Sequence, residues 1–578
     1  MSSYHFILNL LLHMSYYVGA ADVDIWATLN RSVNGNFHSA KPFSLPCFSL
    51  HDGSESSPDL MLCNEIQASY TDSLYRAEFY NGFSNNQDEM CLANNTDKCL
   101  LDPVSPSNPS SFTNRSCNQG SVSEYYIDVQ SPSDILAAFK FSRDTGIKLS
   151  IKNSGHDYLG RSSLKDSLAL WTRNLRHLSR DSAFIPEGCS ASILEPLNTI
   201  TTAAGVNTDE VYNFADSQNV TFIGPYGTSI GVSGGWVQGG GHTVLSTVYG
   251  IGIDRVLQFK VITPDGVERV ANACQNEDLF WALRGGGGGT FGVVLESTHR
   301  VEKAMSLIVS EVRYQQTGGN VNSWFELLVN NSLPWARQGW GGHFRSNNLV
   351  SVTPLLSLEE AKASMKAATD FALANNGTFT VESLPSWQAF YTKYLTPNQA
   401  AVGTPRILAS RLIPSILFSS QEGRTALFEL LQKALKLGLS PYIPTDTPFL
   451  YPYPQNSTSS TIAWRDAVWM LSFGVDIGWN ATLLQQTAIL AKQASLIKDI
   501  EDMIVEFGGV VGSYFNEDSP WTENWTGKWW GKDNYWRLLG IKKRYDPESL
   551  LGCWKCVGFK EEDVHDKFPC YGGISSLA

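Results

Sequence analysis

Two glycine runs, at residues 239–241 and 285–289, hold eight of the chain's 48 glycines. A flexible linker would be flanked by polar low-complexity sequence, but both runs lie between apolar, periodic segments. A Walker-type phosphate loop needs Gly-Lys-Ser/Thr, and Gly289 is followed by Thr290 and Phe291. Glycine backbone can also approach a flat or anionic ligand closely, because no Cβ intervenes and its N–H groups can donate to phosphate. The runs therefore favour two backbone surfaces against one ligand. The absence of Gly-x-Gly-x-x-Gly after a first strand argues against a Rossmann domain, but not against a dinucleotide.

The size and charge of the chain exclude several classes of protein. Its 578 residues exceed one ordinary core, so we expect two folded units or one large unit with an insertion. Hydrophobic content of 43% and aromatic content of 12% are those of a globular protein. The formal charge is −13, from 43 basic and 56 acidic residues, and the pI is near 5.3. Without long basic runs, the sequence predicts no nucleic-acid binding and no attraction to anionic membranes.

The N-terminal segment bears on the cellular compartment. Residues 6–20 are apolar but too few to span a bilayer, so no transmembrane segment is expected. They end in small residues suited to signal peptidase cleavage before Ala21, which predicts a signal peptide at 1–20. Because residues 1–5 contain no Lys or Arg, a buried N-terminal helix is the alternative. Nine Asn-x-Ser/Thr sequons favour a glycosylated, secreted protein. They begin at Asn30, Asn94, Asn114, Asn219, Asn330, Asn376, Asn456, Asn480 and Asn524.

The ten cysteines cluster towards the two ends of the chain. Five lie within 21–120, a segment rich in Ser, Asn and Pro, where we expect disulfides to tie down an extension without a large core. Five is an odd number, so at least one of them must pair elsewhere or stay free. Cys553 and Cys556 have redox-type or zinc-type spacing. No second pair and no histidine at ligand spacing accompany them, and we expect no metal site.

Regular structure is expected to begin near residue 125. The pattern predicts a strand over 125–129 and a helix over 133–144, with Ser131 as N-cap, Pro132 at the first position and Gly146 as a left-handed cap. A second strand, over 147–151, leads into the polar loop 152–163, which is expected to hold a ligand.

Further elements divide into two regions whose composition differs. The first has a strand over 167–171, a helix over 207–217, a hairpin of 256–263 with 267–270, a helix capped by Asn276 that ends near Arg284, and a strand over 291–298. The second, from about 305 to 510, alternates helices with strands. Its expected helices are 358–373, with Ser357 as N-cap, 422–437 and 481–506, and its strands include 407–417 and 468–475.

Four segments follow one another in a recognisable order: IKNSGHDYLGRSS, GGWVQGGGHTVLSTVYGIGIDRVLQFKVITPDG, DLFWALRGGGGGTFGVV and YFNEDSPWTENWTGKWWGKDNYWRLLGIKKRYDP. Together they resemble the fungal FAD-linked oxidoreductases of the vanillyl-alcohol-oxidase group, relatives of berberine-bridge-type enzymes. The resemblance implies an α+β fold with a PCMH-type two-part FAD-binding domain and an inserted α+β substrate domain, an antiparallel sheet covered by helices. The implied boundaries are 21–120 for the extension, 121–303 for the FAD-binding domain, 304–510 for the substrate domain and 511–578 for a segment that returns to the FAD domain.

The resemblance also assigns cofactor contacts. His156 stands where many members attach FAD covalently, and a neutral imidazole is nucleophilic enough for that bond. From the residues alone, His156 would instead be a loop histidine that donates to a backbone carbonyl. Some members add a bond from a cysteine, but that place falls here at Gly227 or Thr228, so single attachment is expected. The other implied contacts are Asn153, Ser154, Gly155, Asp157, Ser162, Ser163, Gly227, Thr228, Gly231, Gly235, Gly240, Gly241, His242, Ile253, Gly292, Val294, Asn534 and Tyr535.

The tail carries the catalytic hypothesis. By resemblance, Tyr514 acts as base or proton relay, and Asn516 orients it by a hydrogen bond. The implied activity is oxidation of a small secondary-metabolite-like substrate by hydride transfer to flavin N5, with O2 as acceptor. Two alternatives stay open: a secreted carbohydrate oxidase on the same fold, and a non-catalytic flavin-fold glycoprotein.

Overall fold

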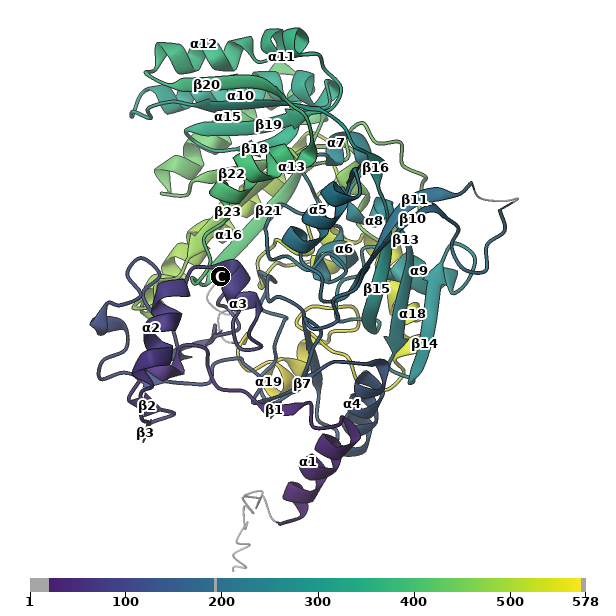
Figure 1. Ribbon diagram of the computed structural model, residues 1–578. Coiled ribbons are helices and arrows are strands. Elements are labelled where there is room, and N and C mark those ends of the chain that lie inside the picture. The colour runs from purple at the N-terminus through teal and green to yellow at the C-terminus, as the bar shows by residue number, and fades with distance from the viewer. Residues whose placement is uncertain (1–19, 192–194, 573–578) are drawn as a thin grey trace, which may run out of the picture.

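The computed structural model describes residues 20–191 and 195–572 (Figure 1). The predicted signal peptide lies outside these residues except for Ala20, where α1 (Ala20–Ser32) begins. Among the helices of the described residues, none has the length and apolar character that a membrane span requires. The main sheets have four, five and seven strands in the described ranges, and helices pack against them, so the fold is α+β.

The four-stranded sheet delivers the chain to the polar loop. In this sheet β7 and β8 both run parallel to β9, which lies between them, and β1 adds an antiparallel edge. Helix α4 joins β7 to β8; it begins after the N-cap Ser131 and ends at Gly146, whose φ of 77° is left-handed. The predicted strand–helix–strand unit is confirmed. The bounds are β1 (Phe37–Ser39), β7 (Tyr125–Asp128), α4 (Pro132–Thr145), β8 (Leu149–Lys152) and β9 (Leu168–Trp171).

The five-stranded sheet is antiparallel throughout, in the order β10, β11, β15, β13, β14. Alternation along β13 gives the sheet two apolar faces. Phe259 and Val261 pack in one cluster with α9 and α18, whereas Ile262 packs in another with α4. The predicted hairpin is β13 with β14. The bounds are β10 (Leu178–Phe184), β11 (Leu197–Ala203), α5 (Thr208–Ser217), β13 (Val256–Thr263), β14 (Val267–Asn272), α9 (Glu277–Leu283) and β15 (Val293–Arg300).

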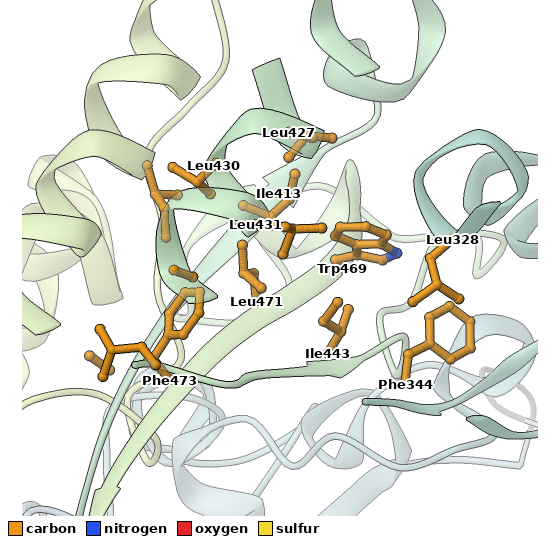
Figure 2. Close-up of a cluster of buried hydrophobic side chains, with 14 of the residues drawn as sticks. Leu328, Phe344, Ile413, Leu427, Leu430, Leu431, Ile443, Trp469, Leu471 and Phe473 are labelled. Carbon is orange, nitrogen blue, oxygen red and sulfur yellow. The ribbon is translucent and has the colours of Figure 1, made fainter. Parts of the chain in front are cut away.

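The seven-stranded antiparallel sheet has the order β20, β17, β19, β18, β22, β23, β21. Helices α10, α15 and α16 pack against it (Figure 1), and Figure 2 shows the buried side chains between helices and sheet, among them Leu328, Leu431 and Trp469. The strand bounds are β17 (Leu307–Arg313), β18 (Gly341–Phe344), β19 (Asn348–Thr353), β20 (Thr378–Leu384), β21 (Arg406–Pro414), β22 (Pro441–Pro444) and β23 (Ala467–Asp476). The helix bounds are α10 (Asn320–Arg337), α11 (Leu358–Ser364), α12 (Lys366–Ala374), α15 (Gln421–Lys436) and α16 (Leu483–Glu506).

Three expectations for local structure were wrong. The helix predicted over 358–373 is two helices that meet at Met365. The strand predicted over 407–417 ends at Pro414, because a turn at Ser415 leads into the short helix α14 (Ile416–Ser419). Asn276 precedes α9 but makes no side-chain cap. Its φ is 49°, and its amide donates instead to the carbonyl of Val270.

The extension packs over the polar loop that follows β8 and is joined to the end of the chain. The ten cysteines form five disulfides, and two of these, Cys47–Cys63 and Cys99–Cys117, lie within the extension. Of the two alternatives for the odd fifth cysteine, pairing elsewhere or staying free, the structure has the first, because Cys91 pairs with Cys570. The helices here are α2 (Leu60–Ser69) and α3 (Ser73–Ala77). The C-terminal helices α17 (Trp525–Trp529) and α18 (Lys532–Tyr545) return to the five-stranded sheet, where α18 packs on α9 (Figure 1).

Candidate active site

A cavity of about 710 Å³ lies where the polar loop, the glycine-rich segments, the seven-stranded sheet and the C-terminal tail meet. Side-chain alternation along β18 and β22 directs His343 and Tyr442 into this cavity, while their neighbours Phe344 and Ile443 pack in the helix-side core. The sheet therefore forms one wall of the cavity, and the two-part glycine-rich region forms the opposite side.

His156 lies in the loop after β8 and lines the cavity. Its Nε2 is 2.6 Å from Ser229 Oγ and 3.1 Å from Ser84 Oγ. Burial, and next the charge of Lys152, lower the pKa of His156 to about 4, so the imidazole is neutral at physiological pH. Because two hydroxyls occupy the region around Nε2, Nδ1 is the ring nitrogen without a hydrogen bond to the described residues.

The extension holds the backbone of this loop. The N–H groups of Ser84 and Asn85 both donate to the carbonyl of Gly155, at 3.0 and 3.3 Å, and the Asn85 amide donates to the carbonyl of His156 at 2.8 Å. Further along the loop, the N–H of Ser163 donates to Asp88 at 3.2 Å. The segment therefore sets the position of His156, a role that sequence reasoning missed because contacts between residues about 70 positions apart leave no local pattern.

The glycine runs make two kinds of contact. The first run packs against protein: an added Cβ at Gly239 would lie 2.3 Å from Asn516 Oδ1, and one at Gly240 would lie 2.9 Å from the Tyr514 ring. Gly235, a few residues earlier, lines the cavity, and an added Cβ there would have no protein atom within 4 Å. In the second run only Gly288 and Gly289 line the cavity.

Tyr514 and Asn516 form one hydrogen-bonded unit at the cavity. The Tyr514 hydroxyl oxygen accepts from the Asn516 amide at 2.8 Å and from the N–H of Gly241 at 3.1 Å. Both contacts favour the phenolate. Burial and then the Glu517 carboxylate have the larger effect and raise the pKa of Tyr514 above its ordinary value, so it stays protonated.

His242 is placed between two carboxylates. Its Nδ1 is 3.1 Å from Asp446 Oδ2, and its Nε2 is 3.0 Å from Glu517 Oε1. Burial alone lowers the pKa of His242, but Glu517 and Asp446 outweigh this effect and raise it to about 10. Asp446 also contacts a second histidine, because its Oδ2 lies 3.3 Å from His343 Nε2. The Nδ1 of His343 in turn pairs with the Tyr442 hydroxyl.

The structure brings most predicted site residues to the cavity. Those that line it are Asn153, Ser154, Gly155, His156, Asp157, Ser162, Ser163, Gly227, Gly231, Gly235, His242, Gly292, Val294, Tyr514 and Asn516. The remainder lie away from its lining, namely Thr228, Gly240, Gly241, Ile253, Asn534 and Tyr535. For example, Asn534 donates to the carbonyls of Ser459 and Ser460, and Tyr535 stacks on Trp530.

Sequence reasoning missed four polar residues of this site. Glu517 directly follows the Tyr-x-Asn motif and could have been found there. His343 and Tyr442 lie on the short strands β18 and β22, and Asp446 lies two residues after β22; the sequence around them has no readable motif. Their juxtaposition depends on the order of strands in the seven-stranded sheet.

The cavity fits an extended polar cofactor. Three buried polar atoms at the cavity have no hydrogen-bond partner among the described residues: Asn153 Oδ1, Arg161 Nη1 and Gln238 Oε1. Native proteins rarely leave such atoms unsatisfied, so they point to partners supplied by a ligand. Open space next to the bare backbone of Gly235 accommodates a group that a side chain would displace.

Comparisons with known proteins define the class. A family model described as FAD binding domain matches residues 123–272, and one described as berberine and berberine like matches residues 513–552. The crystal structure of a VAO-type flavoprotein, MtVAO615 of Myceliophthora thermophila C1, superposes with a TM-score of 0.76 at 24% identity, over 95% of this chain and 97% of that one. The protein is therefore an FAD-binding protein of the vanillyl-alcohol-oxidase fold.

Sequence identity then shows the family. FAD-linked oxidoreductase ffsJ of Aspergillus flavipes is 42% identical over 94% of this chain and 93% of its own length. The chain belongs to the FAD-linked oxidoreductases and is an FAD-dependent enzyme. More distantly, a glucooligosaccharide oxidase of Acremonium strictum with 6-S-cysteinyl, 8α-N1-histidyl FAD shares the fold, with a TM-score of 0.61 and 20% identity over 75% of this chain and 92% of that one.

Proposed function

We propose that this oxidoreductase carries FAD bound covalently through His156 alone, and that it oxidises a small, secondary-metabolite-like substrate with O2 as the electron acceptor. The position and protonation state of His156 are the observation that carries the proposal. A neutral imidazole in the cavity, with Nε2 held by Ser84 and Ser229, has Nδ1 available as a nucleophile. The Acremonium enzyme, whose FAD is 8α-N1-histidyl, is a precedent for attachment through a histidine on this fold.

Single attachment is supported by the cysteines. The Acremonium enzyme also carries a 6-S-cysteinyl bond. In this chain all ten cysteines are in disulfides, and the place expected for such a thiol falls at Gly227 or Thr228. No thiol is therefore available for a second bond while these disulfides are intact.

We assign Tyr514 and Asn516 to proton handling at the substrate. Bound FAD would supply the hydride acceptor, nitrogen N5 of its ring. The chain must then orient the substrate and remove a proton from its O–H or N–H group. Asn516 and the N–H of Gly241 fix the Tyr514 hydroxyl at the cavity. Because Tyr514 stays protonated, we assign it the relay role, in which it passes its own proton on as it accepts one from the substrate.

The exposure of the sequon asparagines and the number of disulfides support a secreted glycoprotein. Eight of the nine sequon asparagines are exposed, and the ninth, Asn30, is half-buried. Five disulfides fit an oxidising compartment.

An aerobic screen tests the function. Purified protein should show the absorbance of an oxidised flavin, and a panel of alcohols and amines, monitored for peroxide, should contain a compound that the enzyme oxidises. A colourless native protein would contradict the flavoenzyme proposal, and flavin reduction without peroxide would contradict O2 as acceptor.

A carbohydrate oxidase is the second candidate, because the similarity to the glucooligosaccharide oxidase extends over 75% of this chain. Oligosaccharides therefore belong in the same screen. Turnover confined to them would replace the secondary-metabolite assignment.

A further inference from the structure

We propose that Glu517 is the catalytic residue that finally accepts the proton leaving the substrate, and that His242 and Asp446 are positioning residues that hold its carboxylate. The inference rests on the proposed function and deepens it. Oxidation of an alcohol to a carbonyl removes a hydride, with two electrons, from carbon, and a proton from oxygen. Bound FAD would supply the oxidant for the hydride, so the proton needs an acceptor on the chain.

The carboxylates at the cavity differ in their partners. Among the described residues that line it, the acidic side chains are Asp157, Asp476 and Glu517. Asp157 is held by the backbone N–H and guanidinium of Arg161, with N···O distances of 2.5 to 2.9 Å. Asp476 is held by Arg406 at 2.6 and 2.9 Å. Arginine stays protonated, so both carboxylates are locked as acceptors in permanent ion pairs.

Glu517 differs from the other two carboxylates because only one of its oxygens is paired. Its Oε1 lies 3.0 Å from His242 Nε2, while its Oε2 has no hydrogen bond to the described residues. The side chain is 16% exposed and lines the cavity, so this free oxygen can meet a substrate group or the Tyr514 hydroxyl.

His242 requires a proton on each ring nitrogen to satisfy both neighbours. Asp446, which is 1% exposed, accepts from Nδ1, and Glu517 accepts from Nε2. The Asp446 carboxylate also faces His343, whose Nε2 lies 3.3 Å from Asp446 Oδ2. Burial alone raises the pKa of Asp446, but His343 and His242 outweigh burial and lower it, which keeps the carboxylate ionised.

The backbone around Glu517 is fixed in place. Ser410 of β21 donates to the Glu517 carbonyl at 2.6 Å. The next residue, Asp518, is fully buried and accepts from Arg411, Ser513 and Trp529 at 2.7 to 2.9 Å. Such anchoring preorganises a reacting group on a rigid scaffold. The titratable groups that interact with the Glu517 carboxylate are Tyr158, His242, Tyr442 and Tyr514, and His242 and His343 face Asp446.

The kinetic test compares Glu517→Gln with Glu517→Asp and with Glu523→Gln, an exposed glutamate of the same tail that serves as the control. Each purified holoprotein is mixed anaerobically with an alcohol that the wild type oxidises, and flavin reduction is followed by stopped flow across pH. Glu517→Gln should retain bound flavin but slow its reduction by about 10²- to 10⁴-fold, the usual contribution of a general base. Glu517→Asp should recover part of the rate, and Asp446→Asn should move the acid limb of the profile to higher pH.

A second measurement does not depend on the substrate. In holoprotein with ¹⁵N-labelled histidine, NMR should show His242 protonated on both nitrogens at neutral pH, and Glu517→Gln should lower its titration point. A titration point near the ordinary histidine value would overturn the assignment, as would equal reduction rates in Glu517→Gln and wild type. A colourless wild type, or a yellow one that no compound reduces, would instead contradict the proposed function.

Discussion

Gly235 provides a direct test of whether glycine backbone contacts the cofactor. It is the first residue of α6 (Gly235–Gly239), its φ is not in the left-handed region, and a Cβ added to it would have no protein atom within 4 Å. Gly235→Ala should therefore leave the fold intact and raise its stability by up to about 1 kcal/mol, because alanine loses less backbone entropy on folding.

The effect on FAD should have the opposite sign. A methyl group placed in a filled site costs about 1–3 kcal/mol, which corresponds to a roughly 5- to 150-fold weaker affinity. The His156→Ala background makes this affinity measurable, because binding there is reversible. FAD is titrated into the apoprotein by fluorescence quenching, and thermal melting of the apoprotein reports stability.

Gly540→Ala is the matched control. Gly540 lies inside α18, an added Cβ there also meets no atom within 4 Å, and the residue does not line the cavity. This substitution should stabilise the apoprotein without changing FAD affinity. Equal FAD affinity in the Gly235→Ala variant and its parent would refute the argument that bare backbone at this position contacts the cofactor.

Three further changes follow from the site. Tyr514→Phe should keep FAD bound but slow flavin reduction by substrate at least about tenfold, and an unchanged stopped-flow rate would remove Tyr514 from the mechanism. Asp446→Asn breaks a buried ion pair and should lower the free energy of unfolding by roughly 3–5 kcal/mol. The folded-state pKa of His242 is raised to about 10, so the loss in free energy of unfolding should be complete below pH 6.5 and should shrink as the pH rises through 10. Melting curves in which the variant and the wild type differ by the same amount at every pH would contradict this prediction. Ser84→Ala removes one of two hydroxyls at His156 Nε2 and should lower the fraction of covalent flavin at unchanged total flavin, as measured by absorbance before and after acid precipitation.

Local signals in the sequence were sufficient for much of the fold. Ser131, Pro132 and Gly146 define α4 because caps act over a few residues, and the loop that carries His156 follows from the strand behind it. The pattern over 358–373 did not reveal the break between α11 and α12, because the apolar periodicity continues across Met365 and does not report the turn conformation of that one residue, whose φ is −87° and ψ is 3°.

The site was predictable only where its residues share a motif. His156, Tyr514 and Asn516 lie in recognisable segments, and the structure brings them to one cavity. His242 and Glu517 are 275 residues apart, and Asp446 lies in a third segment. Their hydrogen bonds arise from strand order and from the return of the tail, which no short-range pattern encodes. Packing within the protein is a second reason for glycine in these runs, because a side chain at Gly239 or Gly240 would collide with Asn516 or Tyr514.

Covalent attachment of FAD to His156 underlies the proposed function, and acid precipitation measures it without a substrate. Wild-type holoprotein is precipitated with acid, the pellet is washed and redissolved in denaturant, and its visible absorbance is compared with that of His156→Ala. We expect a yellow wild-type pellet, a colourless variant pellet with its flavin in the supernatant, and a flavin-bearing peptide that contains His156. A colourless wild-type pellet from a yellow native protein would contradict the claim.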